Sequence, residues 1–284
     1  MGKGIKRALI AAGILFVLGI ALCTVAVATG VNVANVTFFR YDKGEMISFD
    51  QTYIEKIDSI DIDFEAGELK VVEGEQFRVE AQNVPKKAFS VTVDNGTLKV
   101  KENASHWWHL NFGWIFGDNE EEYDSVITVY VPAATTLEKF ELDMSAGKGT
   151  INNIKAEEAK VDMSAGKLDI TAFTISKETK LKMSAGVMNV NKSELKDCDM
   201  HLSAGSLYIE GTLTGDSSAS CSAGSIAIET SLTEDMYDYD ADVSAGSIEI
   251  NGEKITNNHN KINNSASNRF ELDCSAGKIT VKTK

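Results

Sequence analysis

The chain has 284 residues, of which 43% are apolar and 25% charged, and it carries a net charge of −14. This apolar content excludes a disordered chain, because enough hydrophobic surface is present to build a core. The negative charge argues against nucleic acid as a partner and against direct adhesion to anionic lipids or teichoic polymers.

The N-terminus predicts a membrane anchor. Residues 1–7 contain three basic residues and no acid, and the uncharged run that follows begins at Ala8 and ends at Thr29 (residues 8–29). At about 1.5 Å per residue this run spans about 33 Å, enough for a bilayer core. Basic residues before the run place the N-terminus in the cytoplasm and the rest outside, as a single-pass plasma-membrane protein with an extracellular C-terminal domain. A cleaved signal peptide ending at Ala26-Val27-Ala28 is the alternative.

After a connector at residues 30–51, apolar and polar residues alternate, beginning at Ile57. The alternation surrounds a Glu65-Ala66-Gly67 triplet and continues to a strand that Pro132 closes. Asp94-Asn95-Gly96-Thr97 is a hairpin turn signal. We therefore predict that residues 52–141 form the first part of a β-solenoid, or its cap region.

An aromatic insertion at residues 103–124 interrupts this pattern and holds all three tryptophans of the chain. One reading is a hydrophobic plug over the open end of the solenoid, since exposed strand edges aggregate. The other is a loop that rests at the membrane interface or grips an envelope protein or glycan, because tryptophan favours such boundaries. The candidate contact residues are Trp107, Trp108, Phe112, Trp114, Ile115 and Phe116.

Residues 142–284 contain a Ser-Ala-Gly triplet seven times, and its serines follow one another at steps of 19, 20, 19, 19, 22 and 31 residues. Such a period is typical of solenoids, in which each coil buries its apolar face only against its neighbours. We interpret the triplets as structural turns, because glycine allows positive φ and serine and alanine fit a crowded corner. The turn residues are Ser145, Gly147, Ser164, Gly166, Ser184, Gly186, Ser203, Gly205, Ser222, Gly224, Ser244, Gly246, Ser275 and Gly277.

Apolar residues stand one and three places before the serine of each triplet and two and four places after its glycine, with mostly polar residues between them. This period of two predicts an all-β, single-stranded β-solenoid (β-helix) with two or three short strands per coil, stacked about 4.8 Å apart. The polar stretch at residues 251–269 is predicted to be a surface loop.

The cysteines and serines do not predict catalysis. Cys198, Cys221 and Cys274 share the inward-facing parity and are interpreted as small core residues, because their odd number and irregular spacing do not support a disulfide framework. Seven equivalent serines are better explained as turn residues than as a nucleophile, which needs one specialised copy.

Acidic residues offer two weaker candidates. Stacked Asp143 and Asp162 could act as the carboxylate pair of a carbohydrate-active enzyme, although Lys148 and Lys167 are expected to compensate them. The run at residues 234–242 could hold calcium but lacks a glycine turn, and His106 and His109 lack a third zinc ligand. We predict no metal and no cofactor.

The anchor, the strand closing on Val129-Tyr130-Val131-Pro132 and the tandem Leu-Asp-Met-Ser-Ala-Gly units together resemble a Gram-positive family of membrane-anchored "putative adhesin" domains of unknown function. The resemblance covers about residues 50 to 284. It implies a right-handed β-helix-like ectodomain without established catalytic residues. Some relatives belong to operons for cell-envelope stress and antimicrobial-peptide response.

We therefore expect a non-enzymatic extracellular binding or scaffold module for envelope adhesion or stress sensing. Two alternatives stay open. One is a carbohydrate-active β-helix enzyme acting on wall polysaccharide, and the other is a regulatory subunit of a membrane protein complex.

Overall fold

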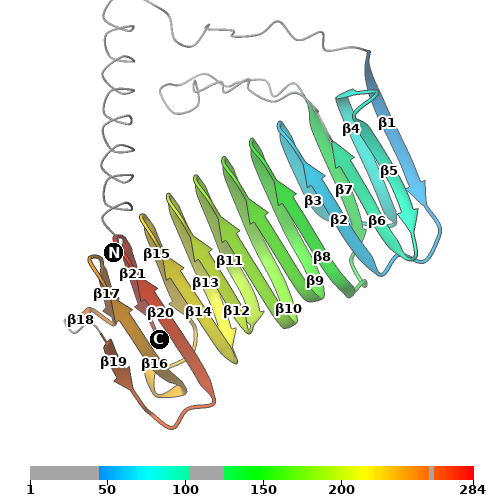
Figure 1. Cartoon of the computed structure of the whole chain (residues 1–284). Helices are drawn as coiled ribbons and strands as arrows, with labels where there is room; N and C mark the ends of the chain where they lie inside the picture. Colours follow the sequence, from blue (N-terminus) through cyan, green and yellow to red (C-terminus); the bar gives the residue numbers. More distant parts are fainter. Residues whose placement is uncertain (1–44, 103–124, 256–258) are drawn as a thin grey trace, which may run out of the picture. The chain divides into compact units, whose positions relative to one another are not determined.

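The computed structural model describes residues 45–102, 125–255 and 259–284 (Figure 1). In these ranges the chain forms strands and a single 3-10 turn, η2 (Glu234–Met236), so the all-β solenoid prediction is confirmed. Within them, no helix has the length and apolar character needed to cross a membrane. The predicted span at residues 8–29 lies outside the described residues.

One pair of coils shows how the solenoid is built. β9 (Lys148–Met163) and β10 (Lys167–Met183) pair in parallel along almost their whole length. Residues with positive φ, Asn153 and Ala172, bend each strand after its first five residues without a change of register. The register shifts between Ile175 and Glu178. Each coil thus contributes a post-corner stretch, a short middle stretch and a pre-corner stretch that leads into the next Ser-Ala-Gly.

Strands from successive coils form two long parallel ladders. In stack order, the post-corner ladder contains β7 (Val126–Pro132), β3 (Glu68–Gly74), the first halves of β9 and β10, β11 (Val187–Lys196), β13 (Ser206–Thr214), β15 (Ser225–Thr230), β21 (Lys278–Lys282) and β17 (Ser247–Ile250). The pre-corner ladder contains β6 (Thr97–Glu102), β2 (Ser59–Phe64), β8 (Leu137–Met144), the second halves of β9 and β10, β12 (Cys198–Leu202), β14 (Asp216–Cys221), β20 (Asn268–Cys274) and β16 (Tyr237–Val243).

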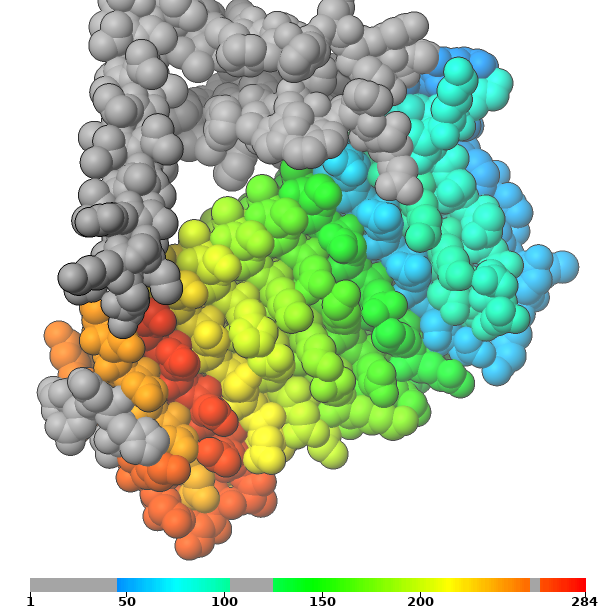
Figure 2. All heavy atoms as spheres, viewed as in Figure 1, coloured from blue at the N-terminus to red at the C-terminus, as the bar shows by residue number. Residues whose placement is uncertain are grey.

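The coils do not stack in chain order at either end. The C-terminal coil, formed by β20 and β21, lies between the β14–β15 coil and the β16–β17 coil. Figure 2 shows it as a red band between yellow and orange ones. At the other end the first coil, β2–β3, lies between β6–β7 and β8–β9. The first and the last coil of the described chain are therefore each second from an end of the stack.

Antiparallel strands cover the outermost coils. β5 (Phe89–Asp94) pairs with β6, β4 (Phe77–Pro85) with β7, and β1 (Met46–Tyr53) with β4. At the opposite end β18 (Glu253–Ile255) pairs with β17, and β19 (His259–Ile262) pairs with β16. Among the described residues, β1, β5, β18 and β19 each pair with a single strand, so these strands, and not the long parallel ladders, form the outer edges of the sheet.

Three boundaries can be compared with the sequence predictions. The prediction that residues 251–269 form a loop is wrong, because β18 and β19 lie within this range and pair with β17 and β16. β1 begins at Met46, inside the predicted connector. The hairpin turn between β5 and β6 is confirmed, with φ of 48° at Asn95 and 77° at Gly96.

Side-chain size explains why the C-terminal coil is placed out of order. Leu272 is in register with Ala219 on one side and Ala241 on the other. Phe270 lies between Ser217 and Tyr239 in the same way, and its ring centroid is 5.9 Å from that of Tyr239. Leu272 thus fills the space beside two alanines, and Phe270 fills the space beside Ser217, as a close-packed interior requires.

Candidate functional site

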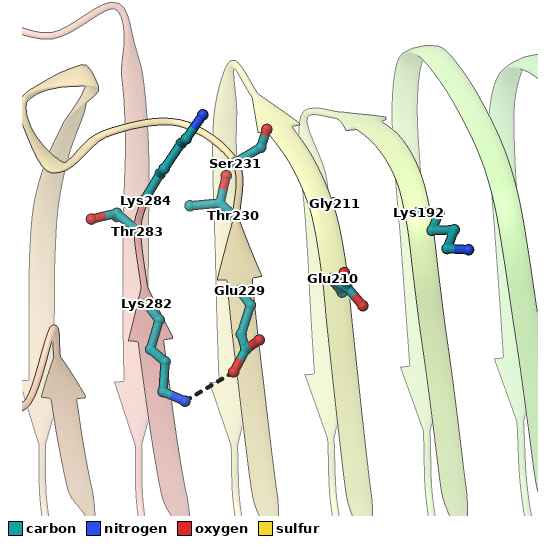
Figure 3. A pocket seen from close by; sticks show the side chains of 9 residues that line it. All are labelled: Lys192, Glu210, Gly211, Glu229, Thr230, Ser231, Lys282, Thr283 and Lys284. Carbon is teal, nitrogen blue, oxygen red and sulfur yellow. Dashed lines mark hydrogen bonds and ion pairs between the residues drawn. The ribbon is translucent and has the colours of Figure 1, made fainter.

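A shallow hollow of about 450 Å³ opens on the post-corner side of the stack, beside the middle of β11 and β13 and the ends of β15 and β21 (Figure 3). Its lining residues are Lys192, Glu210, Gly211, Glu229, Thr230, Ser231, Lys282, Thr283 and Lys284. Glu229 accepts hydrogen bonds from Lys282 Nζ at 2.9 Å and from the Tyr208 hydroxyl at 3.0 Å. These two donors lower the pKa of Glu229, so its charge is satisfied within the wall.

A second polar feature lies where the aromatic insertion joins the solenoid. Glu102 ends β6 and is 3% exposed, and Ser125, which precedes β7, is 6% exposed. The Ser125 hydroxyl donates to the carbonyl oxygen of Ala66 at 2.7 Å, and the Glu68 N–H donates to the Ser125 carbonyl oxygen at 2.9 Å. Both residues therefore belong to the solenoid wall.

Glu102 is a buried carboxyl group next to another one. Burial, aided by the negative charge of Glu65, raises the pKa of Glu102 to about 7, against the hydrogen bond from Ser125. Its Oε2 atom has no hydrogen-bond partner among the described residues. The pKa of Glu65 is itself raised by burial and by Asp63 and Asp143. Glu102 was not predicted from the sequence as a site residue, although its register with Phe64 places it in the inward column one residue before the corner.

The predicted turn residues form one row of corners, and each corner bonds to the coil before it in the stack. In the corner at Ser164, the N–H groups of Ser164, Ala165 and Lys167 donate to carbonyl oxygens of Met144, Ser145 and Gly147. Six of the serines are exposed and Ser145 is half-buried. Gly147, Gly166, Gly186, Gly205 and Gly224 have positive φ.

Asp143 and Asp162 are neighbours in register on the pre-corner ladder, away from the hollow. Burial and the charge of Asp162 raise the pKa of Asp143. The compensating cation is Lys160, whose Nζ lies 3.0 Å from Asp162. The expectation that Lys148 and Lys167 fill this role is wrong for Lys167, which pairs with Asp169 at 2.9 Å.

The acidic side chains of residues 234–242 have separate partners and do not converge on one point. Asp240 pairs with Lys261 at 2.9 Å and with Arg269 at 3.0 Å, and Asp238 accepts the N–H of Asn264 at 2.7 Å. The residues that the structure describes contain no group of three or more His, Cys, Asp or Glu side chains placed closely enough to hold a metal ion. His106 and His109 lie outside those residues.

The predicted contact residues of the aromatic insertion also lie outside the described residues, as does Cys23. Cys198, Cys221 and Cys274 are buried free thiols. Cys221 and Cys274 are in-register neighbours on β14 and β20, a relationship that their spacing in the sequence does not indicate.

Comparison with solved structures finds proteins of low sequence identity. A "putative cell adhesion protein" from Clostridium sporogenes is 11% identical over 84% of this chain and 100% of its own, with a TM-score of 0.39. A "putative adhesin" from Bacteroides fragilis is 12% identical over 84% and 97%, with a TM-score of 0.42. A "putative lipid binding protein" from Parabacteroides distasonis is 11% identical over 85% and 97%, with a TM-score of 0.31. Likeness at this level carries no argument about function.

No curated protein matches the chain. A sequence profile does match, and it extends from residue 57 to residue 282, almost the whole of the solenoid described above. Because this match covers well over half of the sequence, the chain belongs to the Toastrack DUF4097 family, whose domain has no known function.

Proposed function

We propose that the protein is a non-enzymatic, membrane-anchored extracellular module that binds or scaffolds a partner at the cell envelope of a Gram-positive bacterium, in adhesion or stress sensing. Residues 8–29 provide the anchor, the solenoid is a stiff support, and the aromatic insertion provides the contact surface. The partner is an envelope protein or a glycan.

The observation that carries this proposal is the position of Glu102 and Ser125. In the repeat coils, three residues, Ser-Ala-Gly, join the pre-corner strand to the post-corner strand. In the β6–β7 coil, residues 103–124 make the same connection. The insertion therefore begins and ends on buried, hydrogen-bonded residues of the wall. Binding segments mounted on a rigid scaffold are a common arrangement.

The covered stack ends favour a contact role over a plug role. β5 and β4 already pair with the outermost strands β6 and β7, so the ends of the parallel ladders are paired without the insertion. A cluster of tryptophans that edge protection does not require is better explained by recognition, because large aromatic side chains dominate binding hot spots.

The test is crosslinking in intact cells. A photo-reactive amino acid replaces Trp108 in the full chain, and a matched control carries it in place of Val187, an exposed apolar residue of β11. We expect position 108 to capture one defined envelope protein or glycan and position 187 to capture none. Capture should be lost when Trp107→Ala and Trp114→Ala are added. Equal capture from both positions, or none from position 108, would overturn the proposal.

A further inference from the structure

The out-of-order C-terminal coil brings two cysteines together. Cys221 ends β14 and Cys274 ends β20, and the two are in register on neighbouring parallel strands. In sequence, the whole coil with its corner at Ser244 lies between them. Both cysteines occupy the inward column one residue before the corner, and they are 1% and 0% exposed. Their side chains therefore leave the backbone in the same direction, into the same layer of the core.

The spacing suits a disulfide. Neighbouring strands lie about 4.8 Å apart, within the range of about 4.4–6.8 Å between Cα atoms that disulfides span. The Cys221 sulfur points toward the C-terminal coil: it lies so close to Gly277 that a Cβ atom built on this glycine would be 2.6 Å from the sulfur. The Cys274 sulfur leans toward the following coil, since a Cβ atom on Gly246 would lie 2.5 Å from it. Rotation of Cys274 to another staggered χ1 rotamer would turn its sulfur back toward Cys221.

We propose that Cys221 and Cys274 form a disulfide that fastens the inserted C-terminal coil to the coil before it in the stack. The two thiols give up two protons and two electrons as the S–S bond forms. The oxidant is a disulfide, either of a thiol–disulfide oxidoreductase or of a small molecule, and it is reduced to two thiols. The thiolate of one cysteine attacks this disulfide, forms a mixed disulfide and releases the first thiol. The second cysteine then attacks the protein sulfur of the mixed disulfide, which forms the Cys221–Cys274 bond and releases the second thiol.

The bond forms as the coil inserts rather than afterwards. Burial raises the pKa of the Cys221 thiol, with Cys274 contributing, so little thiolate is present once the coil is in place. The bond then closes a long loop and stabilises the folded state by restricting the unfolded chain. Cys198 is buried on a different strand, β12, and remains a thiol.

This inference rests on the proposed extracellular position only for its oxidising environment, so its chemistry is tested on the purified full chain. The reduced, unfolded chain is refolded in glutathione and glutathione disulfide, denatured, alkylated and mapped by mass spectrometry. We expect one peptide pair linking Cys221 to Cys274, with Cys23 and Cys198 alkylated. A Cys198→Ala control should keep the link and Cys274→Ala should lose it. A folded chain in which every cysteine is alkylated, or a link to Cys198, would overturn the inference.

Stability provides a second readout. Reduction should lower the thermal midpoint of the wild type by about 5–10 °C and leave that of Cys274→Ala unchanged. An equal shift in both proteins would contradict the bond. The same alkylation in intact cells separates the two proposals, because a bond that forms in vitro but is absent in cells would contradict the extracellular placement and leave the pairing of the cysteines intact.

Discussion

The backbone N–H of Ser275 donates to the carbonyl oxygen of Cys221 at 3.0 Å, although the complete coil around Ser244 separates these residues in sequence. The N–H of Ser244 in turn donates to the carbonyl oxygen of Cys274, also at 3.0 Å. These are the same backbone bonds that join coils stacked in chain order. Backbone pairing therefore does not select the order of the coils, and the selection must come from side chains.

Leu272→Ala tests this selection. The substitution places three alanines in a row, at positions 219, 272 and 241, and leaves a cavity in a column that is otherwise filled. We expect a loss of about 2–5 kcal/mol in the free energy of unfolding, measured by urea denaturation. The control is Glu271→Ala on the exposed side of the same strand, which should change stability by less than about 0.5 kcal/mol. Similar losses in both variants would show that the inserted coil is not selected by packing.

The coil itself could be predicted from the sequence, because alternation and a tight corner are local signals. The order of the coils could not, since every corner offers the same backbone groups to its neighbour. The sizes of side chains such as Ala219, Ala241 and Leu272 favour the observed order, but they do so only once the neighbours in space are known. The closeness of Cys221 and Cys274 was missed for the same reason.

Gly166→Ala tests the corner. Gly166 has a φ of 108°, and an added Cβ atom would lie 2.2 Å from the carbonyl oxygen of Gly147. Left-handed strain and the clash with a neighbouring corner should together cost about 2–5 kcal/mol in urea denaturation. Gly252→Ala is the matched control, because its φ is 86° but nothing lies within 4 Å of the added atom. This control should lose only about 1–2 kcal/mol of stability, because it suffers the left-handed backbone strain but no clash. An equal loss of stability at both sites would contradict a role for the close approach of neighbouring corners.

Asp143→Asn tests whether Asp143 is a destabilising like-charge neighbour. Burial and Asp162 raise its pKa, so the folded state holds its proton more tightly than the unfolded state does. The wild type therefore loses stability as the pH rises through the pKa of this group. We expect the variant to be more stable at pH 7 by about 0.2–1 kcal/mol, with the difference gone at pH 3. A less stable variant at pH 7 would mean that the charge is needed in the fold.

Glu102 was not predicted as a special residue, because a glutamate at the end of an alternating strand resembles a solvent-facing one. Glu102 shares the inward parity of Leu98 and Val100 on its own strand, but its burial one residue before the corner is fixed by the parallel pairing of β6 with β2, whose first residues, Thr97 and Ser59, lie 38 residues apart. The aromatic insertion that follows was visible in the sequence, whereas the buried carboxyl at its attachment point was not.

Glu102→Gln tests the effect of this carboxyl on stability. Its pKa rises from 4.5 to about 7 on folding, so the folded state binds the extra proton between these values. Stability is thus fully present below pH 4.5 and falls as the pH rises to about 7. The glutamine variant has no charge to bury, and at pH 8 it should be more stable than the wild type by at most about 3 kcal/mol. Urea denaturation from pH 4 to pH 8 measures this difference, with exposed Glu271→Gln as the control. Parallel pH curves for wild type and Glu102→Gln would show that Glu102 is not held protonated by the fold.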